Sequence, residues 1–84
     1  MVEPSKVQEY IENGLECEFI RVVGDGRHFQ AWIVSEAFVG KNRVKQHQLV
    51  YGALGDRMKE EIHALSMKTF TPESWELQKD NFNF

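Results

Sequence analysis

The sequence has few of the features that mark secreted, membrane-bound or disulfide-stabilised proteins. It contains one cysteine, Cys17, so it forms no internal disulfide, which agrees with a reducing compartment. Its apolar runs are only a few residues long, far below the ~20 residues that a membrane-spanning helix needs. The opening MVEPSKVQEY lacks the basic start and apolar stretch of a signal peptide. We therefore expect a cytoplasmic protein that does not bind a membrane.

The size and charge of the chain exclude further classes. A chain of 84 residues predicts one domain, residues 1–84, without a deep pocket between two domains. The net charge of −3 argues against nucleic-acid binding over the whole surface, because phosphate neutralisation supplies most non-specific affinity. The sequence shows no nucleophile with a base, no glycine-rich phosphate loop and no acid–base carboxylate pair. We therefore do not expect an enzyme.

The first part of the chain predicts a helix followed by a β-hairpin. Apolar residues recur at helical spacing over residues 4–13, and Gly14 is expected to end this helix in a left-handed conformation. Residues 16–24 and 28–34 are rich in β-branched and aromatic side chains, which predicts two strands. The Gly-Asp-Gly sequence between them is a turn signal, so we expect a loop of about four or five residues. His28 then re-enters the sheet beside the hairpin tip.

A helical segment is predicted over residues 43–62, after an irregular stretch. Gly52 and Gly55 interrupt it, and each costs about 1 kcal/mol relative to alanine in a helix interior. We therefore expect a kink or two helices meeting there, with close packing on the sheet as the compensation. The apolar stripe expected to face one side consists of Val44, Tyr51, Leu54, Met58 and Ile62.

The last part of the chain predicts a strand and a closing helix. Residues 64–70 alternate partly in polarity, which suits a half-buried strand. Thr71 is expected to cap the helix that Pro72 begins, because proline at the first helical position loses no hydrogen bond. Residues 81–84 are expected to form a frayed tail, with folding back of their two phenylalanines on the sheet as the alternative.

This element order has a geometric consequence for two histidines. A strand, helix and strand in one sheet normally form a right-handed crossover between parallel strands. If the third strand lies beside the second, His28 and His63 stand at the starting ends of parallel neighbours about 4.8 Å apart. Two histidines far apart in the sequence would then share one edge of the molecule.

Three segments together resemble the BolA family, and within it the branch of small bacterial proteins called IbaG or YrbA. The resemblance implies an α+β fold similar to the class II KH domain, with the order α-β-β-α-α-β-α and a three-stranded mixed sheet that has helices packed on one face. It extends from the first helix to Trp75, and an acid-stress role is what this branch suggests. The segments are GDGRHFQ (24–30), F-x-G followed by RVK-x-HQ-x-VY (38–51) and IHALSMKTFTPESW (62–75).

The same resemblance implies an iron–sulfur role with a monothiol glutaredoxin as partner. In the family, a histidine at the position of His63 ligates a [2Fe-2S] cluster shared with glutaredoxin and glutathione, and His28 takes the place of the second ligand. Neutral imidazole is a chemically sensible iron ligand. The simpler alternatives are a rim histidine bonded to a helix-end carbonyl for His63 and a stacked loop side chain for His28. Alone, the protein is expected to be a monomer or weak homodimer.

A basic segment supports a second reading. Lys41, Arg43 and Lys45 form a small cluster that could contact nucleic acid, although a solvated face or a docking patch for an acidic partner is the stronger interpretation. KH domains use a Gly-x-x-Gly loop, and the segment Gly40-Lys41-Asn42-Arg43 lacks the second glycine. Many family members carry Arg-His-Arg where this chain has Gln-His-Gln, centred on His47. We expect His47 and Cys17 to be packing residues.

Overall fold

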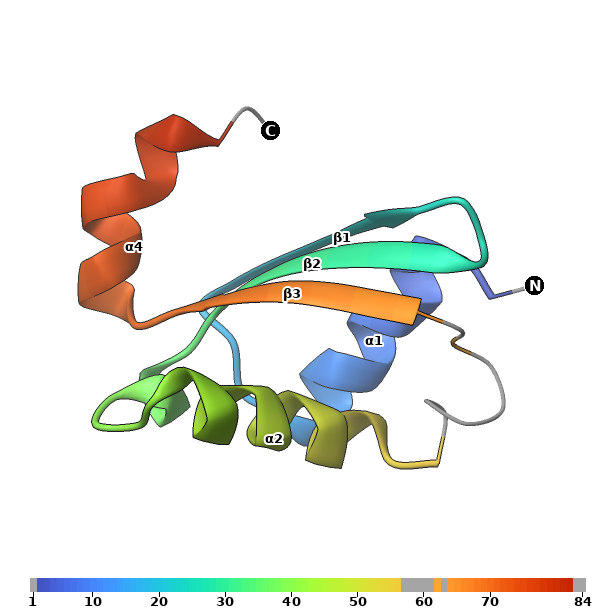
Figure 1. Ribbon diagram of the computed structural model, residues 1–84, viewed down its shortest axis with the longest axis horizontal. Helices are drawn as coiled ribbons and strands as arrows, with labels where there is room; N and C mark the ends of the chain where they lie inside the picture. The colour runs from blue at the N-terminus through green and yellow to red at the C-terminus, as the bar shows by residue number, and fades with distance from the viewer. Residues whose placement is uncertain (1, 57–61, 63, 83–84) are drawn as a thin grey trace.

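The computed structural model describes residues 2–56, 62 and 64–82, which form a three-stranded mixed sheet with helices on both faces. The strand order is β1-β2-β3, with β1 antiparallel and β3 parallel to β2 (Figure 1). The predicted α+β class and mixed sheet are therefore confirmed. The elements in chain order are α1 (Pro4–Gly14), β1 (Phe19–Gly24), β2 (His28–Val34), α2 (Arg43–Leu54), β3 (Ala64–Phe70) and α4 (Pro72–Gln78), with short 3-10 turns at Glu36–Phe38 and Lys79–Asn81.

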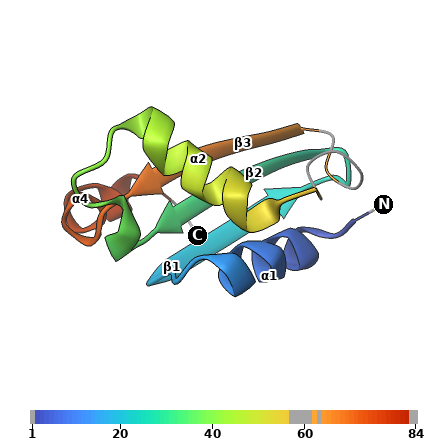
Figure 2. The same cartoon turned by 90° about the horizontal axis from the view of Figure 1, so that it is seen from below.

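Helices α1 and α2 cover one face of the sheet and enclose the hydrophobic core (Figures 1 and 2). Side chains alternate along each strand, so every second residue of β2 enters this core. Burial of such apolar surface is the main stabilising contribution in a chain of this size. The fully buried core side chains include Val7, Ile11, Phe29, Ile33, Phe38, Val50 and Leu54.

The opposite face of the sheet carries α4 and an aromatic cluster, which the expectation of helices on one face did not include. Trp75 stacks on Phe19 with ring centroids 5.0 Å apart, and Phe82 stacks on Trp75 at 5.7 Å. Phe70 lies 5.1 Å from Trp75 and Trp32 lies 6.3 Å from Phe82. Phe82 thus folds back on the sheet instead of fraying, because this face offers it aromatic partners.

The glycines of the two core-covering helices have roles other than those predicted. Gly14 is the last residue of α1 and is not left-handed; it lies against Ala53, where a Cβ would be 2.8 Å from that residue's Cα. Gly52 has open space around it, so close packing on the sheet does not offset the cost of a glycine inside the helix, contrary to the sequence prediction. Gly55 has φ of 59° and caps α2, which ends at Leu54. A second helix of the predicted pair would fall on residues 57–61, outside the described residues.

The predicted apolar stripe of α2 was wrong in its first half. Val44 and Tyr51 are 65% and 41% exposed, whereas Val50 and Leu54 are fully buried. The buried face of α2 therefore keeps Leu54 of the predicted stripe but contains Val50 in place of Tyr51, and Ile62 of the same stripe is only 2% exposed. Met58 lies outside the described residues.

The predicted ends of the strands and helices agree with the structure better than the predicted apolar stripe of α2 does. Thr71 caps α4 by accepting a hydrogen bond from the Ser74 backbone N–H at 3.1 Å, and Pro72 is the first helical residue. β1 starts at Phe19, later than predicted, although the Glu18 N–H still donates to the Val34 carbonyl at 2.8 Å. Within the described part of the chain, no helix has the length and apolar character needed to cross a membrane.

Candidate metal-binding edge

The pairing of β2 with β3 determines which residues meet at the edge of the sheet where both strands begin. His28 pairs with Ala64 at the first position of this parallel ladder. The Ala64 N–H donates to the Arg27 carbonyl oxygen at 3.1 Å, which extends the ladder by one residue into the hairpin loop. The predicted parallel pairing of the two strands is confirmed, and the loop that carries His28 is joined directly to the start of β3.

The hairpin loop is held by the side chain of Asp25. Its Oδ1 accepts hydrogen bonds from the backbone N–H groups of His28 and Arg27, each at 2.9 Å. These two bonds favour the ionised carboxylate and lower the pKa of Asp25, with the His28 bond the larger cause. Gly26 adopts φ of 99°, which suits glycine. The loop therefore presents His28 from a hydrogen-bonded turn.

The His28 imidazole is open to solvent and has a carboxylate beside it. Its side chain is 78% exposed, and its Nδ1 lies 3.9 Å from Asp25 Oδ2, longer than a hydrogen bond. A proton on Nδ1 directed toward the carboxylate leaves Nε2 with the lone pair that a metal needs. The neighbouring surface has a shallow depression of about 350 Å³. This depression is lined by Val23, Gly24, Asp25, His28, Phe29, Gln30, Ala64 and Ser66.

His63, the other predicted ligand, lies outside the described residues. It immediately precedes Ala64 in the sequence, and Ala64 is the residue paired with His28. Among residues 2–56, 62 and 64–82, no group of three or more His, Cys, Asp or Glu side chains is placed to hold a metal ion. An exposed imidazole beside an open depression nevertheless fits the donor that a shared iron–sulfur cluster would require.

The remaining histidine and the cysteine lie elsewhere. His47 is partly buried on α2, where burial and then the charge of Arg43 lower its pKa. Cys17 Sγ donates to the Leu15 carbonyl at 3.3 Å, and burial, assisted by Glu12, raises the pKa of the thiol to about 11. A thiol with so high a pKa is a poor metal ligand and a poor nucleophile at neutral pH.

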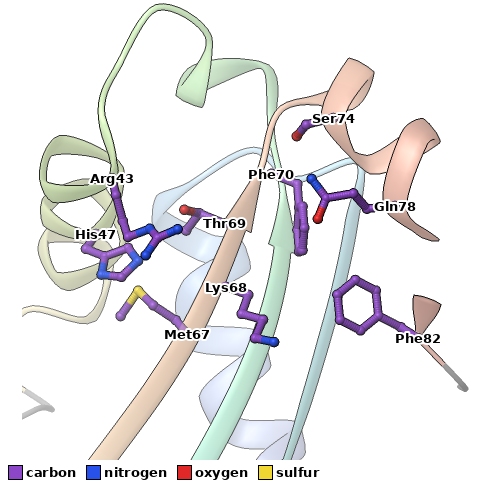
Figure 3. Close-up of a pocket in the computed structure, with 9 residues that line it drawn as sticks. All are labelled: Arg43, His47, Met67, Lys68, Thr69, Phe70, Ser74, Gln78 and Phe82. Carbon is purple, nitrogen blue, oxygen red and sulfur yellow. The ribbon is translucent and has the colours of Figure 1, made fainter. Parts of the chain in front are cut away.

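The three predicted basic residues do not gather in one pocket. Arg43 lines a groove of about 400 Å³ between α2 and α4, which we call the α2/α4 groove, whereas Lys41 and Lys45 are exposed and do not line it (Figure 3). Sequence reasoning missed this groove, although Lys68, a charged residue within the predicted third strand, could have indicated it. The groove is lined by Arg43, His47, Met67, Lys68, Thr69, Phe70, Ser74, Gln78 and Phe82.

Gln46, one of the two glutamines flanking His47, connects α2 to its surroundings. Its Oε1 accepts a hydrogen bond from Thr69 Oγ1 at 2.6 Å, and its Nε2 donates to the carbonyl oxygens of Lys41 and Phe38 at 2.8 and 3.2 Å. An arginine has no acceptor atom and could not take the bond from Thr69. Gln46 therefore joins the start of α2 both to β3 and to the preceding loop.

Comparison with known proteins agrees with this architecture. The family model for BolA-like proteins matches residues 12–74. The chain belongs to the BolA family. It is 41% identical over 75 residues to the acid stress protein IbaG of Escherichia coli K12, covering 88% of this chain and 89% of that protein. It is 33% identical over 84 residues to the DNA-binding transcriptional regulator BolA of Vibrio cholerae, covering 83% and 79%.

A solved structure supports the fold independently of these names. A BolA homologue from Coxiella burnetii superimposes with a TM-score of 0.80 at 40% identity, covering 90% of this chain and 99% of that one. The predicted family and its IbaG-like branch are thus confirmed. These two relatives are named as a stress protein and a DNA-binding regulator, and neither name states an iron–sulfur role.

Proposed function

We propose that this protein is a non-enzymatic adaptor that docks on a monothiol glutaredoxin and shares a [2Fe-2S] cluster with it. His63 and His28 would be its ligands, and glutaredoxin with glutathione would supply the rest. The observation that carries the proposal is the parallel pairing of His28 with Ala64, the residue after His63. The BolA resemblance supplies the partner and the cluster type.

The chemistry of the edge supports this assignment. Replacing thiolate by neutral imidazole at one iron raises the reduction potential of a [2Fe-2S] cluster. Because the imidazole must be deprotonated to bind iron, cluster sharing would weaken as the pH falls. Asp25 would act as a positioning residue, since its carboxylate holds the backbone of His28 and lies beside the imidazole Nδ1. Such an adaptor suits cluster trafficking or iron sensing.

The experiment compares the three histidines of the chain. The protein is mixed with a monothiol glutaredoxin, Fe²⁺, sulfide and glutathione, and visible absorption and circular dichroism are recorded beside size-exclusion chromatography. We expect a heterodimer whose spectrum differs from that of the glutaredoxin homodimer. His63→Ala should abolish that spectrum and His28→Ala should shift or weaken it.

His47→Ala is the matched control, because His47 lies on α2 in the separate α2/α4 groove. It should leave the heterodimer spectrum unchanged. A spectrum that survives His63→Ala would remove the ligand assignment, and the absence of any heterodimer would remove the adaptor function itself.

Nucleic-acid binding is the second candidate function, favoured by the name of the Vibrio cholerae relative and by the cationic segment Gly40–Gln48. It requires an affinity that falls steeply with salt and drops when Lys41 or Arg43 is neutralised. Fluorescence anisotropy with duplex and single-stranded oligonucleotides at several salt concentrations measures this. Lack of binding near physiological salt would eliminate it.

A further inference from the structure

The strand β3 is an edge strand whose outer side has no strand partner among the described residues. The Ala64 N–H donates to Arg27, and the Phe70 carbonyl accepts from Ser35, each at 3.1 Å. In a parallel strand, every second residue directs both its backbone N–H and its C=O toward the same neighbouring strand. Ala64 and Phe70 belong to the set that faces β2, so the backbone groups of Met67 and Thr69, which belong to the other set, face away from β2. Within the described part of the chain, no hydrogen bond from another segment reaches those backbone groups. β3 therefore offers a donor and acceptor row at strand spacing.

The α2/α4 groove lies along this free edge and has two different walls. Figure 3 shows Met67 and Thr69 on the α2 side, where Arg43 and His47 project, and Lys68 and Phe70 on the α4 side. An extended chain laid beside β3 would direct alternate side chains to the two walls. This is the arrangement by which strand addition combines backbone hydrogen bonds with side-chain specificity.

Each wall contributes one positive charge. Arg43 stands on the α2 wall and Lys68 on the α4 wall, while none of the nine lining residues is an aspartate or glutamate. Neither cation forms an ion pair with a carboxylate of the described residues. The Lys68 Nζ lies 5.4 Å from the centroid of the Phe82 ring, which leaves its ammonium at the groove. Adjacent residues of an added strand would meet one cation each.

We propose that the α2/α4 groove binds an extended peptide segment of a partner protein, which adds to β3 as a fourth strand and carries two adjacent acidic residues. One carboxylate pairs with Arg43 and the other with Lys68. A second copy of this chain fits less well, because its own β3 sequence, ALSMKTF, contains a lysine and no acid. A nucleic acid fits less well because the net charge of −3 opposes a polyanion.

This groove, on the outer side of β3, is separate from the metal-binding edge, which is the end of the sheet where β2 and β3 begin. His28 and Ala64 stand at the start of β2 and β3, whereas the groove lies toward the end of β3. The six steps from Ala64 to Phe70 correspond to roughly 20 Å of strand. A glutaredoxin at one end and a peptide at the other could therefore be held together, which would let the protein bring a cluster partner to a second protein.

The test uses ¹⁵N-labelled protein and a capped hexapeptide pool with two central Asp or Glu residues and mixed flanking residues. We expect saturable shifts in the amide resonances of Met67 and Thr69, with those of Arg27 and His28 unmoved. A matched pool with two central lysines and an acidic pool methylated on alternate backbone nitrogens should both fail to bind. The first control tests charge and the second tests the strand hydrogen bonds.

Charge-reversal variants locate the site. Arg43→Glu and Lys68→Glu should each weaken binding about tenfold or more, the change that corresponds to ~1.4 kcal/mol. Lys45→Glu is the matched control, since Lys45 is also on α2 but does not line the groove. Far-UV circular dichroism confirms that each variant is folded; all three positions are exposed.

Several results would overturn the proposal. These are no shifts at about 1 mM peptide, which corresponds to ~4 kcal/mol of binding free energy; equal binding of the lysine or methylated pools; and equal loss in Lys45→Glu and Arg43→Glu. Binding of a single-stranded oligonucleotide, but not of the acidic pool, with the same amide shifts would assign the groove to nucleic acid instead.

Discussion

Gly14 at the end of α1 lies directly against Ala53 of α2. A Cβ placed on Gly14 would be 2.8 Å from both the Cα and the Cβ of Ala53, a distance that real Cβ contacts do not reach. The two core-covering helices therefore approach each other backbone to backbone at this point. The glycine is required by packing and not by a left-handed turn.

This contact predicts opposite effects for two glycine substitutions. Gly14→Ala should lower the free energy of unfolding by about 1–3 kcal/mol, because the added methyl group overpacks the crossing of the helices. Gly52→Ala is the matched control in α2, where no atom lies within 4 Å of the new methyl group. It should raise the free energy of unfolding by about 0.5–1 kcal/mol through helix propensity. Urea denaturation measures both, and a stabilising Gly14→Ala would contradict the packing explanation.

The aromatic cluster on the other face predicts that Phe82 contributes to stability despite its place near the end of the chain. Its ring lies 5.6 Å from Phe70, 5.7 Å from Trp75 and 6.3 Å from Trp32. Phe82→Ala should cost about 1–3 kcal/mol and reduce the near-UV circular dichroism of the two tryptophans. Leu77→Ala is the control, because Leu77 is 80% exposed and should change stability by less than about 0.5 kcal/mol. Equal effects would mean that the cluster does not form in solution.

Local signals in the sequence predicted the elements better than their packing. The hairpin tip, the Thr71 cap and the half-buried β3 each depend on a few neighbouring residues, so turn and cap chemistry was enough to place them. Which helix covers which face depends on contacts between distant residues, which periodicity does not contain. The exposed Val44 and Tyr51 illustrate this: both are apolar at helical spacing, yet α2 meets the sheet through the face of Val50 and Leu54.

The candidate sites show the same division. The element order predicted that β3 runs parallel to β2 and, if the two are neighbours, that His28 lies at the start of β3; the structure confirms that they pair. The α2/α4 groove did not follow, because it forms where the edge of β3, the start of α2, helix α4 and Phe82 come together. The sequence showed Gln46 where many family members carry arginine, but it did not predict the hydrogen bond that Gln46 accepts from Thr69.

Cys17 should react slowly with alkylating agents while the protein is folded. Burial and the Glu12 charge raise the pKa of its thiol from 9.0 to about 11, so the thiolate fraction near pH 8 falls about a hundredfold. Iodoacetamide labelling followed by mass spectrometry should therefore be about a hundredfold faster in urea than in buffer. Since the unfolded thiol ionises first, stability should fall as the pH rises above 9.0. Rapid labelling of the folded protein would contradict this environment.

Asp25 should make the hairpin loop sensitive to acid. Its folded-state pKa is lowered below the usual 3.8 by hydrogen bonds from His28 and Arg27, so its contribution to stability is present above that value and is lost as the pH falls through the folded-state pKa. Asp25→Asn should therefore show a smaller loss of stability between neutral pH and pH values below 3.8 than the parent protein. Urea midpoints at several pH values measure this, and parallel curves would contradict the role of the carboxylate.

His47 should report on the charge of Arg43, which lies beside it on the α2 wall of the α2/α4 groove. Burial is the main cause of its lowered pKa and the Arg43 charge is the second, so the folded state binds the proton less tightly than the unfolded state, and His47 destabilises the fold as the pH falls below 6.5. Arg43→Gln should raise the pKa of His47 part of the way toward 6.5, because burial remains. Lys45→Gln should raise it less, since Arg43 is the charge that acts on this histidine. An NMR titration of the imidazole carbon-bound protons measures all three proteins. Binding of the acidic peptide pool should move the same pKa upward by neutralising Arg43, whereas an unchanged titration would place the peptide carboxylates away from this wall of the groove.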